Sequence, residues 1–121
     1  MLYVREALSE DYNAIYKLMK NELGYPNLIE SELLKRLEHF DNSDDWSTFV
    51  AVINDKVVGF IGVMKGMTYS IDGFYSQIMV LVVSNNAIRK GVGTALVKKA
   101  EEWSLSHGIT DIAVNCNMKR L

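Results

Sequence analysis

The residues best suited to chemistry lie together in one short segment, Arg89-Lys90-Gly91-Val92-Gly93-Thr94, between an apolar run and a helical pattern. Glycines permit positive φ angles, and because they carry no Cβ they let a ligand approach the backbone closely. The first amides of a helix that follows such a turn point outward without partners. Arg89 and Lys90 add positive charge in a chain whose formal net charge is −2. The segment therefore predicts a cradle for an anion such as a phosphate group.

Spacing separates the known classes of glycine-rich phosphate site. A P-loop requires a Lys-Ser/Thr pair directly after the second glycine of a longer motif, and Gly93-Thr94-Ala95 does not provide it. A dinucleotide fingerprint requires a third glycine where Leu96 stands. It also requires an acid at the end of a strand to bind the ribose, whereas Asp111 is expected at the start of a strand. A further interpretation involves no ligand, with Gly91 and Gly93 forming only a tight turn from strand to helix. The residues alone leave the anion cradle and the plain turn open.

The elements around the segment predict a single α/β domain over residues 1–121. Apolar residues on both faces of 74–83 indicate a central strand before it. The helix after it is expected to end near His107-Gly108, and a last strand is expected over 109–116. Alternating and helical periodicities predict the elements upstream. These are a strand at 3–7, a helix from a Ser9 cap to about Leu23, a second helix from about Asn27 to Phe40, and a hairpin of 49–53 and 56–63 around Asn54-Asp55.

Composition disfavours several classes of protein. At 121 residues, with 49% hydrophobic and 23% charged residues, the chain has the composition of one folded domain. Its acidic balance argues against nucleic acid as a partner, and its longest apolar run, 78–83, is too short to cross a membrane. One thiol, Cys116, with His39 and His107 elsewhere makes a poor zinc site and favours a reducing compartment. We therefore expect a cytoplasmic domain with no metal, no nucleic acid and no membrane contact.

The stretch 81–96, Leu-Val-Val-Ser-Asn-Asn-Ala-Ile-Arg-Lys-Gly-Val-Gly-Thr-Ala-Leu, resembles the acetyl-CoA-binding motif of the Gcn5-related N-acetyltransferases, or GNATs. That motif is usually written Arg/Gln-x-x-Gly-x-Gly/Ala after a strand ending in Leu-x-Val. The order of the predicted elements fits the same family along the whole chain. The resemblance implies a mixed, mostly antiparallel sheet flanked by helices, without the family's usual last helix and final hairpin. It also implies transfer of an acetyl group from acetyl-CoA directly to a primary amine of a small molecule.

The resemblance assigns roles to individual positions. It implies that the main chain of Leu81 and Val83 pairs with the pantetheine arm of the coenzyme, in the gap between the strands ending at Val83 and Cys116. The Leu81 amide becomes the catalytic donor, near the thioester oxygen, where a fixed donor stabilises the developing oxyanion. Asn117 is assigned to coenzyme binding as well. The coenzyme pyrophosphate is expected on the amides of Arg89, Lys90, Gly91, Val92, Gly93 and Thr94.

The sequence departs from the family pattern in three places. Ile88 stands where the motif has Arg or Gln. Gln77 stands where some relatives have a general-base glutamate, and an amide cannot take a proton, which leaves water, a main-chain carbonyl, Asp72 or Glu22. The sequence stops before the helix that carries the family's general-acid tyrosine. A non-catalytic acyl-CoA-binding module is therefore the alternative to an enzyme, and apolar surface on the last two strands predicts a homodimer.

Overall fold

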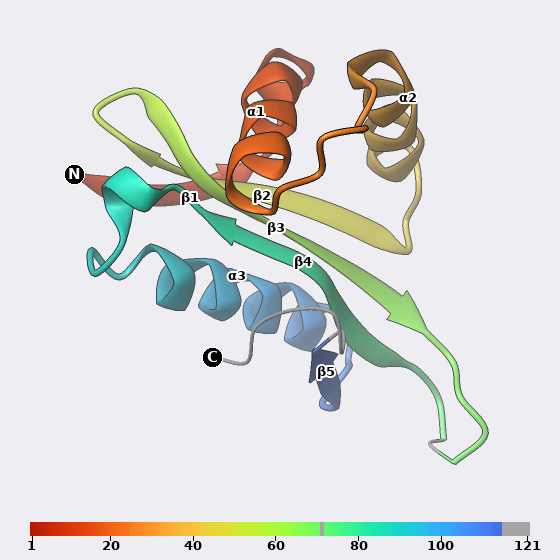
Figure 1. Ribbon diagram of the computed structural model, residues 1–121. Coiled ribbons are helices and arrows are strands. Elements are labelled where there is room, and N and C mark those ends of the chain that lie inside the picture. Colours follow the sequence, from red (N-terminus) through yellow and green to blue (C-terminus); the bar gives the residue numbers. More distant parts are fainter. Residues whose placement is uncertain (71, 115–121) are drawn as a thin grey trace.

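A sheet of five strands runs through the described residues, 1–70 and 72–114, of this computed structural model (Figure 1). Four neighbouring strands are antiparallel: β1 (Leu2–Glu6), β2 (Trp46–Ile53), β3 (Lys56–Gly66) and β4 (Tyr75–Val83). β5 (Ile112–Val114) lies beside β4 and runs parallel to it. A parallel pair needs a crossover connection, and helix α3 (Val92–Ser106) supplies it. The mixed, mostly antiparallel α/β fold predicted from the sequence is confirmed.

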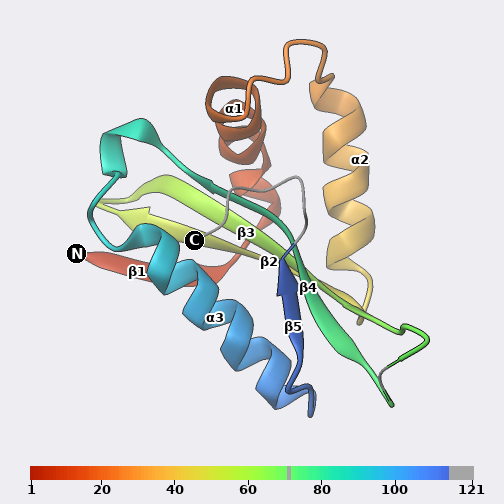
Figure 2. The same ribbon diagram turned by 60° about the horizontal axis from the view of Figure 1, so that its bottom comes forward.

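Helices cover both faces of the sheet. α1 (Tyr12–Glu22) and α2 (Glu30–Asp41) lie on one face, and α3 lies on the other (Figure 2). Each face has its own apolar core, because successive side chains of a strand point to opposite sides. The buried strand residues include Val50, Val52 and Phe60 on the α1/α2 side, and Phe49, Ile61 and Val63 on the α3 side. In the described part of the chain, no helix is both long and apolar enough to cross a membrane.

Close packing of α3 against the sheet depends on Gly59. A Cβ at this position would lie 2.8 Å from the carbonyl oxygen of Val82 and 3.0 Å from Cγ1 of Val92. Such an approach is too close for a real side chain, so only glycine lets the first turn of α3 lie against β3. Val92 and Leu96 are fully buried at this contact. The N-terminus of α3 is thereby held close to the end of β4.

The first helix begins differently from the prediction that Ser9 caps it. Ser9 instead opens a short 3-10 turn, η1 (Ser9–Asp11), and the Leu8 amide donates a hydrogen bond to the Asp11 carboxylate at 2.7 Å. The Arg5 guanidinium donates two more bonds to this carboxylate, at 2.7 and 3.0 Å, and holds the pKa of the Asp11 carboxyl below its usual range. The predicted cap was wrong because this charged clamp between β1 and η1 is stronger than a neutral hydroxyl cap.

Three other boundaries can be compared with the sequence. The turn at Asn54-Asp55 is confirmed, with φ of 50° and 66° at its two residues, as expected for a tight hairpin. The second helix begins at Glu30 rather than near Asn27, after Ile29, which makes no side-chain cap. The last strand occupies only Ile112–Val114 within the described residues, shorter than the predicted span.

Candidate functional site

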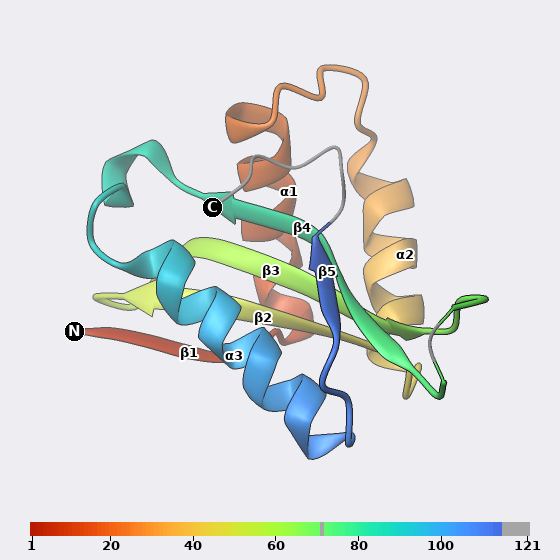
Figure 3. The ribbon, with the colours of Figure 1, turned by 90° about the horizontal axis from the view of Figure 1, so that it is seen from below.

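β4 runs on alone after its short pairing with β5. The two parallel strands are in register only at Ser76, Gln77 and Ile78, opposite Ile112, Ala113 and Val114. Figure 3 shows β4 continuing beyond that point toward the turn that leads into α3. Over the rest of β4, the edge that faces away from β3 has no strand partner among the described residues. This open edge can hydrogen-bond an extended ligand as a neighbouring strand would.

A β-bulge at Met79 sets the direction of the main chain along this edge. Gly62 pairs with Val80 and Val63 with Ile78, so Met79 has no partner on β3. An extra residue reverses the alternation of a strand. Ile78 accordingly packs on the α3 side, whereas Val80, two residues on, packs on the α1/α2 side. The bulge lies where the pairing with β5 ends. From Val80 onward, each residue faces the side opposite to the one that uninterrupted alternation from Ile78 would give it.

The main-chain groups of Leu81 and Val83 point into the open edge. The Ser84 amide donates to the carbonyl of Val58 on β3 at 2.8 Å. Since main-chain groups alternate in direction along a strand, those of Val82 also point toward β3, and those of Leu81 and Val83 point away from it. Both positions are only partly buried, with side chains packed on the α3 side. The sequence prediction for these two residues is thus compatible with the geometry.

The turn from β4 to α3 presents main-chain donors at its tip. η2 (Asn85–Ala87) begins after Ser84, and Arg89 and Gly91 then take left-handed backbone conformations, with φ of 72° and 77°. The first helical hydrogen bond runs from the Ala95 amide to the Gly91 carbonyl at 3.0 Å. Among the described residues, no acceptor is recorded for the amides of the residues between those two, Val92, Gly93 and Thr94. These groups form the positive end of the α3 dipole.

Two glycines keep this helix end open. At Gly91 a Cβ would meet nothing within 4 Å, and at Gly93 it would meet only Cγ2 of Val83, at 3.9 Å. Gly91 is needed for its positive φ, but Gly93 has no such requirement. Glycine within a helix costs about 0.5 to 1 kcal/mol relative to alanine, so the fold by itself gives no reason for Gly93. A ligand in contact with the backbone does give one, which favours the anion cradle over the plain turn.

The side chains beside the cradle are exposed. Arg89 and Lys90 form no ion pair with any described residue, so their charge is available to an anion. Ile88, in the position where the motif has a polar residue, is 53% exposed and offers no hydrogen bond. Asn117 lies outside the described residues, as does the entry to a further helix expected there.

The candidate proton acceptors lie in different places. The Tyr75 hydroxyl donates to Oε1 of Gln77 at 3.1 Å, so the side-chain carbonyl of Gln77 is already occupied. Glu22 accepts a hydrogen bond from the Asn85 amide at 3.3 Å, which places it beside η2 at the cradle end of β4. Asp72 is exposed and precedes the opposite end of β4. Of the two carboxylates considered from the sequence, the fold brings only Glu22 to the cradle end of β4.

An apolar hollow adjoins the loop between α1 and α2. It has a volume of about 430 Å³ and is lined by residues that include Met19, Tyr25 and Leu28. A larger hollow, of about 780 Å³, lies elsewhere, at the end of the sheet near the C-terminus of α3. Cavity size alone therefore does not locate the cradle, which is an open surface formed by backbone.

Sequence reasoning missed Met79. The run from 78 to 83 is apolar at every position, so side-chain alternation gives no sign that the strand changes face within it. The available signal is Gly62 on the neighbouring strand, since glycine within a strand often marks an irregularity.

Comparisons with known proteins agree with this geometry. The profile of the acetyltransferase (GNAT) family matches residues 5–121. A GNAT family acetyltransferase from Staphylococcus aureus has 29% sequence identity and a TM-score of 0.79, covering 94% of this chain and 85% of that one. A transcriptional regulator from Bacillus halodurans has a TM-score of 0.88 at 18% identity, covering 99% and 85%. Aminoglycoside N-acetyltransferase AAC(6')-Iy in complex with CoA has a TM-score of 0.83 at 16% identity, covering 95% and 76%.

No curated protein matches the chain by sequence. The two structures below 20% identity show a shared fold only. The family profile covers almost the whole sequence, including the open edge of β4, the cradle and α3. The chain belongs to the GNAT family of acetyltransferases.

Proposed function

We propose that this chain is an acetyl-CoA-dependent N-acetyltransferase that acts on the primary amine of a small molecule. The observation that carries the proposal is the continuity of two backbone surfaces, the open edge of β4 and the partnerless amides at the start of α3. A long ligand with an amide-containing arm and a diphosphate would engage both. Acetyl-CoA has that form.

The cradle would bind the diphosphate. The amides of Val92, Gly93 and Thr94 would donate to its oxygens, and the α3 dipole would add to the attraction. Arg89 and Lys90 would neutralise charge from the solvent side. Because neither Gly91 nor Gly93 has a Cβ, the oxygens can reach the main chain directly.

The open edge of β4 would align the reacting group. The main chain of Val83 would pair with the arm, and the Leu81 amide would donate to the thioester oxygen as negative charge develops on it. Acetyl-CoA, when bound, supplies the acetyl group, whose carbonyl carbon forms a bond to the amine nitrogen while its bond to sulfur breaks. β4 carries no carboxylate, so in this proposal water takes the amine proton, and the coenzyme leaves as a thiolate that is protonated from solvent.

The acceptor is proposed to enter by the hollow between α1 and α2, where Tyr25 and Leu28 offer apolar contact. Aminoglycoside acetyltransferases are among the structures with this fold, including one from a soil metagenomic sample in complex with sisomicin, at 20% identity and a TM-score of 0.75. An aminoglycoside-type amine is therefore a reasonable first member of an acceptor panel. A cytoplasmic location is part of the proposal, since acetyl-CoA is available there.

The alternative is a module that binds acyl-CoA without turnover. The observation that favours it is that β4 carries Gln77 and no carboxylate, so the strand supplies no general base. Titration calorimetry with acetyl-CoA, with thiol release followed in the same sample, separates the two. Binding with amine-dependent thiol release supports the enzyme, and binding without release across the amine panel supports the module. A Gly91→Glu/Gly93→Glu variant should bind nothing, and a wild-type chain that fails to bind overturns both.

We also propose a homodimer that covers β5. Ile112 and Val114 are 39% and 44% exposed, although they belong to a strand of the sheet. Sedimentation of the wild-type chain and an Ile112→Lys/Val114→Lys variant tests this. The wild type should be a dimer and the variant a monomer, and a wild-type monomer that persists at high concentration would contradict the proposal.

A further inference from the structure

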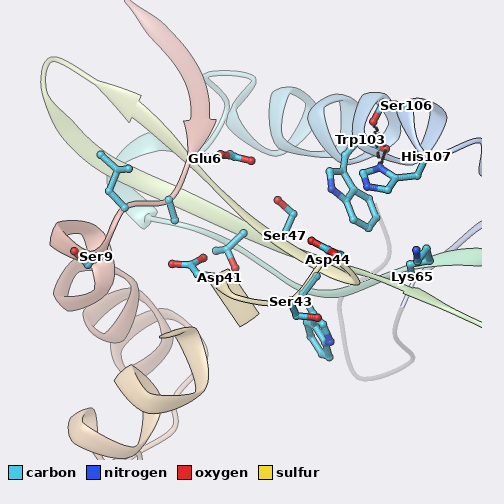
Figure 4. A pocket seen from close by; sticks show the side chains of 14 residues that line it. Glu6, Ser9, Asp41, Ser43, Asp44, Ser47, Lys65, Trp103, Ser106 and His107 are labelled. Carbon is cyan, nitrogen blue, oxygen red and sulfur yellow. Dashed lines mark hydrogen bonds between the residues drawn. The ribbon is translucent and has the colours of Figure 1, made fainter. Parts of the chain in front are cut away.

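A second, larger hollow of the described surface lies far from the cradle. Its volume is about 780 Å³, and it is bounded by the end of β1, the loop from α2 to β2 and the last turn of α3 (Figure 4). The cradle is at the other end of α3, a helix of 15 residues, which corresponds to about 20 Å. Nothing in the proposed acetyl transfer uses this hollow.

The hollow arises because β2 extends beyond β1. The last residue pair of β1 with β2 is Glu6 opposite Phe49, followed by a hydrogen bond from the Ala7 amide to the Thr48 carbonyl at 2.9 Å. β2 already begins at Trp46, so its first two residues have no neighbour on that edge among the described residues. Side chains from both faces of the sheet meet at this step, which leaves room for a ligand.

Acidic side chains dominate the charge of the lining. Glu6, Asp41 and Asp44 line the hollow, and the one lysine among the lining residues, Lys65, lies 3.3 Å from the carboxylate of Asp45. Asp41 accepts a hydrogen bond from the Tyr12 hydroxyl, which together with burial raises the pKa of Tyr12. Glu6 and Asp44 have no ion-pair partner among the described residues. The hollow therefore attracts cations.

Both tryptophans of the chain line this hollow. Trp46 stacks on Phe40 with ring centroids 4.1 Å apart, and Trp103 lies against His107 at 4.4 Å. Each indole is held by an aromatic neighbour and stays only half-buried. Fixed, partly exposed indole rings bind alkyl groups and organic cations, through apolar contact and through the negative potential of the ring face. Figure 4 shows Trp103 and the acidic side chains of Glu6 and Asp44 around the same space.

We propose that this hollow is a second binding site, for an organic ammonium ion with an apolar body. The carboxylates of Glu6 and Asp44 would offset the charge of the ammonium group, and the indole of Trp103, on the same face of the sheet as Glu6, would contact the apolar part. The site does not depend on the coenzyme, so its test can be run without acetyl-CoA.

Tryptophan fluorescence gives a direct test, because both reporters line the hollow. Benzylamine, which is protonated at neutral pH, is the probe, and benzyl alcohol is its neutral counterpart of nearly equal shape. Benzylamine should change the emission saturably with a Kd of about 1 mM or tighter, and benzyl alcohol should not saturate in that range. Equal responses to both compounds, or no saturable response to benzylamine, would overturn the proposal.

Charge-matched variants test whether benzylamine binding depends on the carboxylates of the hollow or on the overall charge of the chain. Glu6→Gln/Asp44→Asn should raise the Kd of benzylamine about tenfold. Glu101→Gln/Asp55→Asn removes the same number of exposed carboxylates outside the lining and should leave the Kd unchanged. The same increase in both double variants would overturn the proposal, and thermal unfolding of each variant confirms that it is folded.

Discussion

Gly93→Ala tests whether the glycine at this position is required by a bound ligand or by the fold, because the two explanations predict different effects on stability and binding. An added Cβ would meet only Cγ2 of Val83, at 3.9 Å, which is an ordinary contact, and the residue has no positive φ. Alanine in a helix is more stable than glycine by about 0.5 to 1 kcal/mol. In a chain of 121 residues, that corresponds to a rise in Tm of about 3 °C.

The same methyl group would stand on the surface proposed to contact the coenzyme diphosphate. We expect the affinity for acetyl-CoA to fall at least about tenfold, a loss of about 1.4 kcal/mol. Circular dichroism during heating and titration calorimetry on the same preparation measure the two effects. Gly93→Ala protein that binds acetyl-CoA like the wild type, or that unfolds at a lower temperature, would refute the reasoning.

A matched pair of glycines controls for stability. Gly91 and Gly108 lie at opposite ends of α3, with φ of 77° and 73°, and at both a Cβ would meet nothing within 4 Å. Alanine at either position should destabilise the fold by about 1 kcal/mol, because the left-handed conformation disfavours a side chain. Only Gly91→Ala should lose acetyl-CoA binding. An equal loss in Gly108→Ala would show that affinity follows stability rather than contact with the cradle.

Three further substitutions test the fold and the proposed chemistry. Gly59→Ala should destabilise the protein by about 1 to 3 kcal/mol in urea, because its Cβ would lie 2.8 Å from the Val82 carbonyl oxygen, and an unchanged midpoint would contradict this packing. Asp11→Asn should destabilise the fold near neutral pH. Arg5 lowers the folded pKa of Asp11, so the stabilisation is complete above the unfolded pKa of about 4 and is lost as pH falls through the folded pKa. The difference in unfolding free energy between the two proteins should therefore shrink from about pH 6 to about pH 3, and a constant difference would argue against the ion pair. Leu81→Pro should keep the fold but lower kcat about 100-fold, since it removes the proposed oxyanion donor, whereas Val82→Pro should disrupt the pairing with β3. Unchanged kcat in folded Leu81→Pro protein would exclude the Leu81 amide as that donor.

The sheet and its helices could be predicted because periodicity and turn chemistry agree locally. Asn54-Asp55 between two apolar runs specifies a hairpin without help from the rest of the molecule. The start of the first helix could not be predicted in the same way. Asp11 is held by Arg5, which comes from another element, and no local rule identifies that partner.

The candidate site was predicted in its residues but not in its geometry. The spacing of Gly91 and Gly93 predicts an exposed helix end, and the structure places the partnerless amides there. The bulge at Met79 depends on how β3 and β4 share residues between Gly62 and Val63. In a strand that is apolar at every position, the sequence pattern does not change at such a register shift. The shift can therefore be recognised only from the pairing of the two strands.

Strand geometry explains how one stretch of β4 could serve the core and the proposed ligand at once. Side chains leave a strand perpendicular to the sheet, whereas amides and carbonyls lie within its plane. Leu81 and Val83 therefore pack against the α3 side with their side chains while their main-chain groups face the open edge. Met79 has no partner on β3, so the main-chain groups of Ser76 and Ile78 face away from β3 before it and those of Leu81 and Val83 do so after it. The proposed coenzyme contact thus requires only that the side chain at these positions be apolar, which is why Leu and Val in a plain strand do not by themselves indicate chemistry.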